Sequence, residues 1–396
     1  MVRIIKKIFS RLKHKYNFSP LPFCVFFPNS AWHHKACCFR YFPQYTFVLS
    51  FSLQVFLTLI WPLRLLFQAI YCFKIFGKKA GVLSSRHSLR IFIESVFYGL
   101  WLAMPPRQYY RYQIFSHKHP AKNWLLDHQI FALLPYVNNY LDDERISDKA
   151  RFYQFCQEHN FSYPKTFLAT ELADLLKQPA FIIKKKQGSG GEGFQVCTKA
   201  NNTWHIAKHI KQNKTTIIEL NNTELLHYLK SKDNQYLFQE QLVNHSGFNF
   251  VNAKQLITLR LISIKKVGEE VSCIAGLLFI PKPHHLNNNN GFIANVNIET
   301  GKVGLLFNRK PLQQGVEYYP KNHKRITNQI VPLFNEAKLL ATSCHKHYSQ
   351  KILAFDLAIT QQQVSLLEIN TGFDIASHQI THQKPTDLFS NLMNRF

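Results

Sequence analysis

The chain has 396 residues, of which 46% are hydrophobic and 14% aromatic, and this composition excludes a wholly disordered protein and leaves room for two or three structural units. The formal net charge of +25 is uneven, because residues 1–125 carry eighteen Lys or Arg and one acid, Glu94. So basic a segment is expected to bind a polyanion, either an anionic membrane or a nucleic acid. Eight scattered cysteines without a Cys-x-x-Cys pair indicate reduced thiols in a cytosolic compartment and argue against a cysteine metal cluster.

The N-terminal third is rich in apolar, helix-forming sequence. Residues 2–16 form a short basic amphipathic pattern, typical of a helix at a membrane interface, and lack the cleavage site of a signal peptide. Residues 41–63 contain no charge, and the apolar pattern resumes over 65–76 after Pro62 and Arg64, where we expect the first helix to end. Three alternatives stay open: a transmembrane or re-entrant helix, helices lying on the membrane, or buried helices of an N-terminal subdomain.

An amphipathic helix is predicted over residues 85–103, ended by two prolines. Tyr109, Tyr110 and Tyr112 follow, interleaved with arginines. Such interleaving can stack nucleic-acid bases, but a packed surface turn is the favoured interpretation.

Acidic residues become frequent from Asp142 onward, and we place the main domain boundary there. Beyond it, strand and helix signals alternate, with a helix over 148–159 capped by Ser147. Further helices are expected over 171–177, 222–232 and 326–348, and strands from 163 and over 181–183, 194–197, 236–243, 256–265, 271–279, 292–298, 303–307, 352–359 and 364–369.

A glycine-rich stretch, residues 181–194, reads FIIKKKQGSGGEGF. The spacing Gly188-x-Gly190-x-x-Gly193 satisfies the dinucleotide fingerprint, but that fingerprint requires a helix directly after the loop, and here the continuation is β-like. No Gly-Lys-Ser/Thr follows, which excludes a P-loop. Glycine amides beside lysines favour a flap over a triphosphate. A flexible hairpin tip with solvated lysines is the alternative.

A second constellation lies near the C-terminus. Glu368 and Asn370 are two residues apart and leave the same face of a predicted strand, while Asp356 lies on the preceding strand. Two carboxylates and a carboxamide make an oxygen site suited to Mg²⁺, with Mn²⁺ as an alternative. Ordinary polar residues at strand ends are the competing interpretation.

Together the two constellations resemble the ATP-grasp enzymes, in which two α+β subdomains hold ATP, one with a glycine flap and the other with metal carboxylates. The resemblance covers Asp142 to His382 and implies an α+β, ATP-grasp fold behind a basic, mostly helical N-terminal region. The implied domains are residues 1–141, with a candidate membrane segment at about 41–76, and an ATP-grasp domain at 142–396, with a flap at 184–193, a hinge at 239–243 and metal strands within 352–370.

The resemblance also implies roles for single residues. Arg260 would stabilise an acyl phosphate in place of an arginine that D-alanine–D-alanine ligases carry where this chain has Ala354; a salt-bridge role is the alternative. The remaining implied set is Lys149 and Lys184 on ATP phosphates, Gly188, Ser189, Gly190 and Gly191 over the β/γ end, Gln239, Glu240, Gln241 and Leu242 at the adenine, and Asp356, Glu368 and Asn370 on Mg²⁺.

Within the superfamily the chain is most similar to the sugar-transfer-associated branch related to α-L-glutamate ligases. The residues that carry this likeness include residues 106–110 (PRQYY), Gln239-Glu240 and the strand FDLAIT. The implied activity is an ATP- and Mg²⁺-dependent carboxylate–amine or carboxylate–nucleophile ligase, acting through an acyl phosphate on a small molecule, an amino-acid conjugate or a cell-surface glycan. It would work in the cytoplasm at the inner face of the membrane, bound to anionic lipid through residues 1–125.

Two alternatives to a ligase stay open. A non-catalytic ATP-binding scaffold is favoured by Ala354 and by Lys185, which stands where the family has proline. A nucleic-acid-binding protein is favoured by the basic N-terminal third alone, but its basic residues flank apolar stretches and do not form a polar face, which favours a membrane surface.

Overall fold

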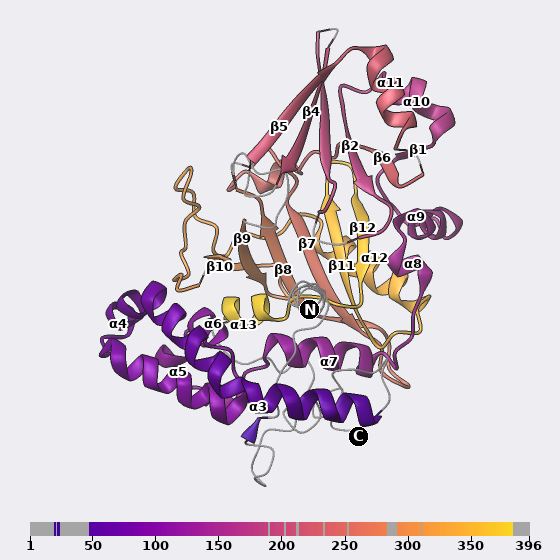
Figure 1. Ribbon diagram of the computed structural model, residues 1–396. Helices are drawn as coiled ribbons and strands as arrows, with labels where there is room; N and C mark the ends of the chain where they lie inside the picture. The colour runs from indigo at the N-terminus through magenta and orange to yellow at the C-terminus, as the bar shows by residue number, and fades with distance from the viewer. Residues whose placement is uncertain are drawn as a thin grey trace, which may run out of the picture. The chain divides into compact units, whose positions relative to one another are not determined.

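The computed structural model describes residues 20, 22–23, 47–188, 191–201, 203–210, 214–232, 234–251, 253–282, 291–309 and 311–382 (Figure 1). The chain divides into two compact units, each drawn from separate stretches of sequence. Unit 1 comprises Met1–Tyr140, Lys310–Gln314 and Gly372–Phe396, and unit 2 comprises Leu141–Arg309 and Gly315–Thr371. The predicted basic helix at 2–16 and the asparagine run before Gly291 lie outside the described residues.

Unit 1 is helical, as predicted for the N-terminal region. Among the described residues, one helical stretch, Gln54–Ser84, is long and apolar enough by length and composition to cross a membrane. The helices are α3 (Phe47–Cys72), a π-helical turn (Phe73–Gly77), α4 (Lys78–Ser84), α5 (Ser88–Leu102), α6 (Pro106–Arg111), α7 (Asp127–Val137) and α13 (Ala376–His382), with 3₁₀ turns at Ile114–Ser116 and Ala121–Asn123.

The predicted end of a helix at Pro62 and Arg64 is wrong, because both residues lie inside α3. A proline inside a helix removes one backbone hydrogen bond and its ring crowds the carbonyl one turn earlier, which together cost about 3 kcal/mol. Here the buried stripe continues across it, with Leu57, Trp61 and Leu65 all nearly inaccessible. Packing of that stripe therefore outweighs the local helix-breaking signal.

The three tyrosines after the double proline are buried in the core of unit 1. Tyr109, Tyr110 and Tyr112 are at most 1% exposed, and they pack with Trp124 and Phe115. Their rings are not accessible for stacking on bases, so the packed interpretation is the one that the structure shows.

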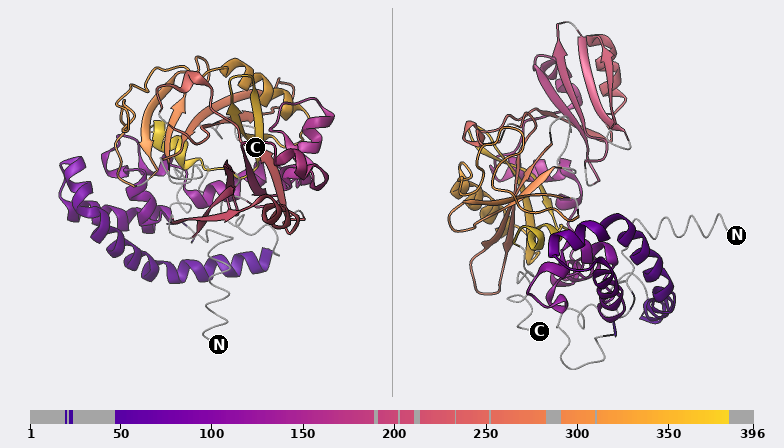
Figure 2. Two further views of the ribbon diagram at one scale, coloured as in Figure 1. Left: turned by 90° about the horizontal axis from the view of Figure 1, so that it is seen from above. Right: turned by 90° about the vertical axis from the view of Figure 1, so that its left-hand side faces the viewer.

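The first sheet of unit 2 contains the glycine-rich hairpin. Its strands pair antiparallel in the order β1 (Thr166–Phe167), β6 (Tyr236–Glu240), β2 (Ala180–Lys185), β3 (Gln195–Ala200), β4 (Thr203–Ile210) and β5 (Lys214–Leu220). Helices α10 (Leu172–Leu175), after a 3₁₀ turn at Ala169–Glu171, and α11 (Asn222–Lys230) lie against this sheet (Figure 2). Their residues Leu175 and Leu229 share a buried core with Phe181 and Trp204 of the sheet. The two strands predicted on either side of the glycine loop are confirmed, because β2 and β3 pair antiparallel.

The second sheet of unit 2 contains the two strands with the predicted metal ligands. Its order is β10 (Val303–Asn308), β9 (Phe292–Val296), β8 (Ser272–Ile280), β7 (Thr258–Ile264), β11 (Ile352–Ile359) and β12 (Val364–Asn370). Residues of α9 (Lys149–Glu158) and α12 (Phe334–Lys346) share its hydrophobic core, and α8 (Glu144–Ser147) and a 3₁₀ turn at Ser246–Phe248 complete the unit.

Two predicted helix starts in unit 2 are wrong. The long helix expected over 326–348 begins only at α12, after Leu333 in a left-handed conformation with φ 49°. Residues 328–331 instead bond to the β9–β10 hairpin, with the Asn328 amide donating to the Val303 carbonyl at 2.8 Å and the Val331 amide donating to that of Gly301 at 3.0 Å. The cap of α9 is Asp148, whose carboxylate accepts the Ala150 amide, and Ser147 belongs to α8.

Candidate functional site

Three charged side chains stand in register across neighbouring strands of the second sheet. Asp356 on β11 lies opposite Arg260 on β7 and opposite Glu368 on β12. Ala354, Phe355 and Asp356 share one register with β12, and a register shift just after Asp356 offsets the pairs from Leu357 onward by one residue. Arg260 binds Asp356 through two parallel hydrogen bonds, Nε to Oδ1 and Nη2 to Oδ2, both 2.6 Å.

Asn370 completes the predicted metal group. Its Nδ2 donates weakly to Oδ2 of Asp356 at 3.4 Å and to Oε1 of Glu368 at 3.3 Å. The residues fit a hard cation, since all available ligands are oxygens once the amide turns its carbonyl inward. Over the described ranges no group of three or more His, Cys, Asp or Glu could hold a metal, so this mixed carboxylate–carboxamide set stands as the candidate.

Lys149, the first residue of α9, connects this group to the glycine loop. Its Nζ lies 3.7 Å from Oε2 of Glu368 and donates to the Gly188 carbonyl at 2.9 Å. Its amide donates to the Lys186 carbonyl at 2.9 Å, and Asp148 forms a bridge to Gln187. The start of α9 is thus bound to the end of β2, which fixes Lys149 between loop and carboxylates.

Lys184 on β2 reaches the same place from the first sheet. Its Nζ donates to the Tyr153 hydroxyl at 2.5 Å and lies 4.8 Å from the centre of that ring. The hydroxyl in turn donates to the Leu367 carbonyl of β12 at 2.6 Å. The sequence analysis missed Tyr153, although it lies four residues after Lys149 and therefore on the same face of a predicted helix.

The ionisable groups perturb one another strongly. Burial lowers the pKa of Lys184 to about 7; nearby Glu368 opposes this and Lys149 adds to it. Burial raises the pKa of Asp356 to about 6 in spite of Arg260. Burial also acts to raise the pKa of Glu368. The charge of Lys149 and the other partners of Glu368 outweigh this effect, so the pKa of Glu368 lies below its ordinary value. Glu368 is therefore the more firmly ionised carboxylate of the pair.

The glycine loop depends on positive backbone angles. Gly188, Gly191 and Gly193 have φ of 118°, 72° and 73°, a region that other residues rarely adopt. Lys185 forms an ion pair with Glu192 at 2.6 Å, which gives this lysine a partner inside the loop. Ser189 and Gly190, predicted over the β/γ-phosphates, lie outside the described residues.

The predicted adenine hinge lies at the end of β6. Gln239 is fully buried and donates from Nε2 to the Thr166 hydroxyl at 2.8 Å. The Glu240 amide donates to the Lys165 carbonyl at 3.0 Å, and its carboxylate accepts the Lys165 amide at 2.7 Å. Gln241 and Leu242 follow the strand. Because the Glu240 amide already donates to Lys165, a ligand at this residue would bind the Glu240 carbonyl.

Comparison with known proteins places the chain by sequence. The sequence model described as "Sugar-transfer associated ATP-grasp" matches residues 131–392. Among curated proteins, none matches. The fold of unit 2, with its two antiparallel sheets and the glycine hairpin, is the ATP-grasp fold. The chain belongs to the sugar-transfer-associated ATP-grasp family. ATP-dependent ligation of a carboxylate to an amine is typical of ATP-grasp enzymes.

Several solved structures are similar over part of their length. N5-carboxyaminoimidazole synthetase from Staphylococcus aureus, complexed with ADP, is 8% identical with a TM-score of 0.32, and 58% of this chain matches 45% of that one. The ATP-grasp ligase PsnB with its precursor peptide and AMPPNP is 10% identical, TM-score 0.35, over 63% and 57%. D-alanine–D-alanine ligase from Bacillus anthracis is 10% identical, TM-score 0.33, over 62% and 66%. The chain thus spans about half to two thirds of the length of these proteins.

Proposed function

We propose that the protein is an ATP- and Mg²⁺-dependent ligase that joins a carboxylate to an amine or another nucleophile through an acyl phosphate. One observation carries the proposal. Two lysines, Lys149 from α9 and Lys184 from β2, converge on Glu368, which β12 presents beside Asp356 and Asn370. A nucleoside triphosphate with its metal ion is bound by positive charge next to carboxylates, and this site combines the two.

The reaction would proceed in two steps. A carboxylate oxygen of the substrate attacks the γ-phosphorus of ATP, the bond to the β–γ bridging oxygen breaks, and ADP leaves. The nucleophile then attacks the acyl carbon, loses its proton, and phosphate departs with the electrons of the carbon–oxygen bond. Phosphoryl transfer of this kind needs positioning and charge neutralisation more than covalent help from the protein.

Each site residue has a role in this scheme. Lys149 and Lys184 would bind the α- and β-phosphates, and the amides of residues 188–191 would cover the β/γ end. A Mg²⁺ ion held by Asp356, Glu368 and Asn370 would neutralise charge on the β- and γ-phosphates when bound. Arg260, which meets the site beside Asp356, would stabilise the acyl phosphate. The Glu240 carbonyl and the Leu242 amide would receive the adenine.

The substrate proposal follows the family description. We propose a cell-surface sugar or an amino-acid conjugate as one partner in the ligation, in the cytoplasm and next to the membrane, with unit 1 on the anionic lipid surface.

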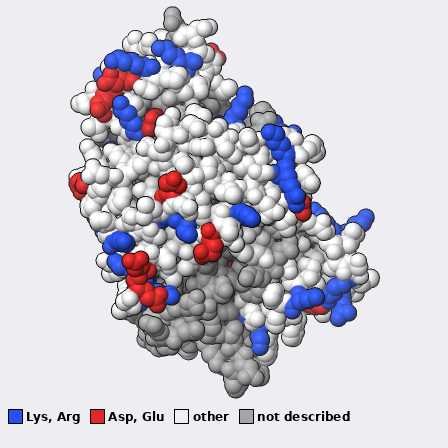
Figure 3. All heavy atoms as spheres, turned by 180° about the vertical axis from the view of Figure 1, so that it is seen from behind, with Lys and Arg blue, Asp and Glu red and all other residues white. Residues whose placement is uncertain are grey.

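A groove that binds nucleic acid would be expected to carry a continuous basic band. On the face in Figure 3, the Lys and Arg side chains of the described residues are separated by Asp, Glu and uncharged surface.

One observation favours a second candidate, an ATP-binding scaffold without turnover. Ala354 is fully buried and paired between Ile262 and Asn370, so the position of the arginine found in D-alanine–D-alanine ligases is filled by a small core residue. Release of ADP in a screen of candidate carboxylates and amines separates the two candidates, because a scaffold binds ATP and does not consume it.

The ligase proposal is tested first at nucleotide binding. We expect Lys184→Ala and Glu368→Ala each to weaken ATP·Mg binding by at least tenfold, because each removes a charge-assisted contact worth about 1.5–3 kcal/mol. Isothermal titration calorimetry measures the affinity, and circular dichroism checks the fold. Lys230→Ala and Glu270→Ala, at exposed positions of unit 2, are the matched controls and should bind as the unaltered protein does. Unchanged nucleotide affinity in both site variants would contradict the assignment.

A further inference from the structure

Helix α3 of unit 1 has two apolar faces, and among the described residues one of them is buried and the other exposed. The inner face, including Trp61 and Leu65, is buried, whereas Leu59 is 75% and Phe67 67% exposed. Large apolar side chains so exposed on one element mark an interaction surface. The exposed apolar side chains described on this outer face are Phe56, Leu59, Leu63, Leu66, Phe67, Ile70 and Tyr71.

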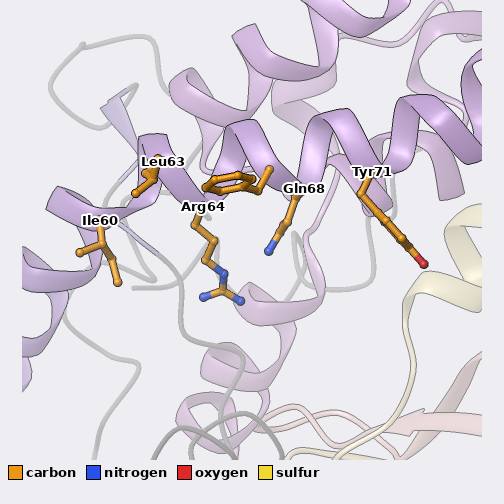
Figure 4. Close-up of a pocket in the computed structure, with 6 residues that line it drawn as sticks. Ile60, Leu63, Arg64, Gln68 and Tyr71 are labelled. Carbon is orange, nitrogen blue, oxygen red and sulfur yellow. The ribbon is translucent and has the colours of Figure 1, made fainter. Parts of the chain in front are cut away.

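A shallow hollow with one charge lies along one side of this outer face. It has a volume of about 480 Å³, and its described lining residues all belong to α3, with Arg64 and Gln68 among the apolar side chains of Ile60, Leu63, Phe67 and Tyr71 (Figure 4). A guanidinium pairs well with a phosphate group, and apolar side chains beside it suit acyl chains. The hollow therefore matches the headgroup and upper chain region of a phospholipid.

The charged residues of unit 1 indicate whether the outer face would bind an anionic or a neutral membrane. Residues 47–140 and 372–382 of unit 1 contain ten Lys or Arg and three acids, namely Asp127 and Asp374, which both pair with Arg111, and Glu94. That carboxylate is already bound by Arg86, by Arg90 at 3.5 Å and by the Tyr109 hydroxyl at 2.9 Å. The helical part of unit 1 thus presents an excess of positive charge beside an exposed apolar face, which is the composition of an interfacial membrane helix.

The inner face of α3 shows how the helix would meet the membrane. The Trp61 indole donates to the Gly99 carbonyl of α5 at 2.8 Å, and Leu65 fills the space beside Gly99 so closely that a Cβ there would lie 2.3 Å from it. Helix α5 has 15 residues and includes Arg90 and Glu94, so it is too short and too polar to cross a bilayer with α3. A crossing α3 would have to give up this packing.

We propose that α3 lies in the plane of an anionic membrane, with its outer face among the lipids and α5 on the side of the cytoplasm. The inference rests on the membrane location within the proposed function. Of the three alternatives that the sequence leaves open for this segment, it selects a helix lying on the membrane over one that crosses it. An active site held at such a surface is suited to substrates that are themselves attached to lipid.

The test uses the full-length protein with vesicles of phosphatidylcholine alone or with 30% phosphatidylglycerol, followed by sedimentation. We expect binding to the anionic vesicles only, weakened at least tenfold between about 0.1 and 0.5 M salt. The double variant Leu63→Glu/Phe67→Glu should lose at least tenfold in vesicle affinity. The control Ile217→Glu/Leu339→Glu, at positions of unit 2 that are 59% and 67% exposed, should bind vesicles as the unaltered protein does.

Three outcomes would overturn the proposal. Equal loss in both double variants would remove the assignment to α3, and extraction from vesicles by detergent but not by salt or carbonate would show a crossing helix. A lipid-free dimer that Leu63→Glu/Phe67→Glu converts to a monomer would assign the face to a second copy of the chain.

The ATP·Mg affinity, measured on the same samples, separates this inference from the proposed ligase function. If the unaltered protein binds ATP·Mg but no anionic vesicles, the result counts against this inference alone. If it binds the vesicles but no ATP·Mg, the result counts against the ligase.

Discussion

At the scale of the residue, Lys184 donates to the Tyr153 hydroxyl and lies near the charge of Glu368. The distance of four residues from Lys184 to Gly188 pointed to this lysine among three neighbours, and the structure places it beside Tyr153 and Glu368. Lys185 is accounted for by its ion pair with Glu192. Arg260 forms a salt bridge, which was the alternative role expected for it, but its partner Asp356 was not predictable, because the contact depends on the strand register of residues 96 positions apart.

The pKa of Lys184 leads to a pH-dependent affinity. Burial lowers that pKa to about 7 in the free protein, and a bound phosphate would favour the charged form again. ATP binding above pH 7 should therefore take up one proton, and the affinity should fall by up to about tenfold per pH unit.

Calorimetry between pH 6 and 9, in buffers of different ionisation enthalpy, measures both quantities. Lys184→Arg, whose side chain stays charged throughout, should flatten the profile. An affinity of the unaltered protein that is constant from pH 6.5 to 8.5 would show that Lys184 does not carry the linkage.

At the scale of elements, apolar and alternating stretches predicted most of the strands, whereas β4 and β5 of the first sheet were not expected. The strands β7, β8, β11 and β12 lie within two residues of their expected bounds. The helix over 326–348 was overestimated, since residues 328–331 pair with the β9–β10 hairpin, and a helical periodicity in the sequence does not reveal a distant partner. The same limit explains Pro62 inside α3, where packing against other helices decides.

Helix α12 is joined to the second sheet by a buried histidine. His345 accepts the Ser263 hydroxyl of β7 at Nδ1, 2.5 Å away, and donates from Nε2 to the Gln350 carbonyl at 2.8 Å. Both ring nitrogens are satisfied in the neutral form, and burial lowers the pKa to about 4. Because the unfolded chain takes up this proton near pH 6.5, stability should be lost as pH falls from about 6.5 to 4.

Urea denaturation at pH 7, 6 and 5 measures this loss, which a single such group limits to about 1.4 kcal/mol per pH unit. His345→Gln should lower stability at pH 7 and reduce the further decline toward pH 5. His227→Gln, at an exposed position of α11, should leave the decline as it is. A decline that is equally steep in both variants would assign it to other groups.

At the scale of the molecule, the chain returns to unit 1 after the second sheet. The side chain of Gln379 on α13 bonds both backbone groups of Leu125, with its oxygen accepting at 3.0 Å and its nitrogen donating at 2.8 Å. Such a non-local association leaves no trace in local sequence patterns. The predicted extent of the ATP-grasp domain, residues 142–396, stays a prediction.

Two compact units predict two unfolding transitions in calorimetry. ATP·Mg at about 100 times its dissociation constant stabilises the binding unit by about 2.7 kcal/mol, or roughly 5–11 °C for a unit of this size. Only the transition of unit 2 should shift, and Glu368→Ala, which binds at least tenfold more weakly, should lose about half of the shift or more. A single transition that moves as a whole would show that the units unfold together.

Strand β12, which carries Glu368 and Asn370, is the last strand of its sheet. An edge strand of this kind can add a strand from another chain and start aggregation. Here the Leu366 amide donates to the Ser162 carbonyl at 2.8 Å, and the Leu367 carbonyl accepts the Tyr153 hydroxyl. The contacts that position the carboxylate therefore also close the sheet against intermolecular pairing, so that a variant of Tyr153 would affect solubility as well as the nucleotide.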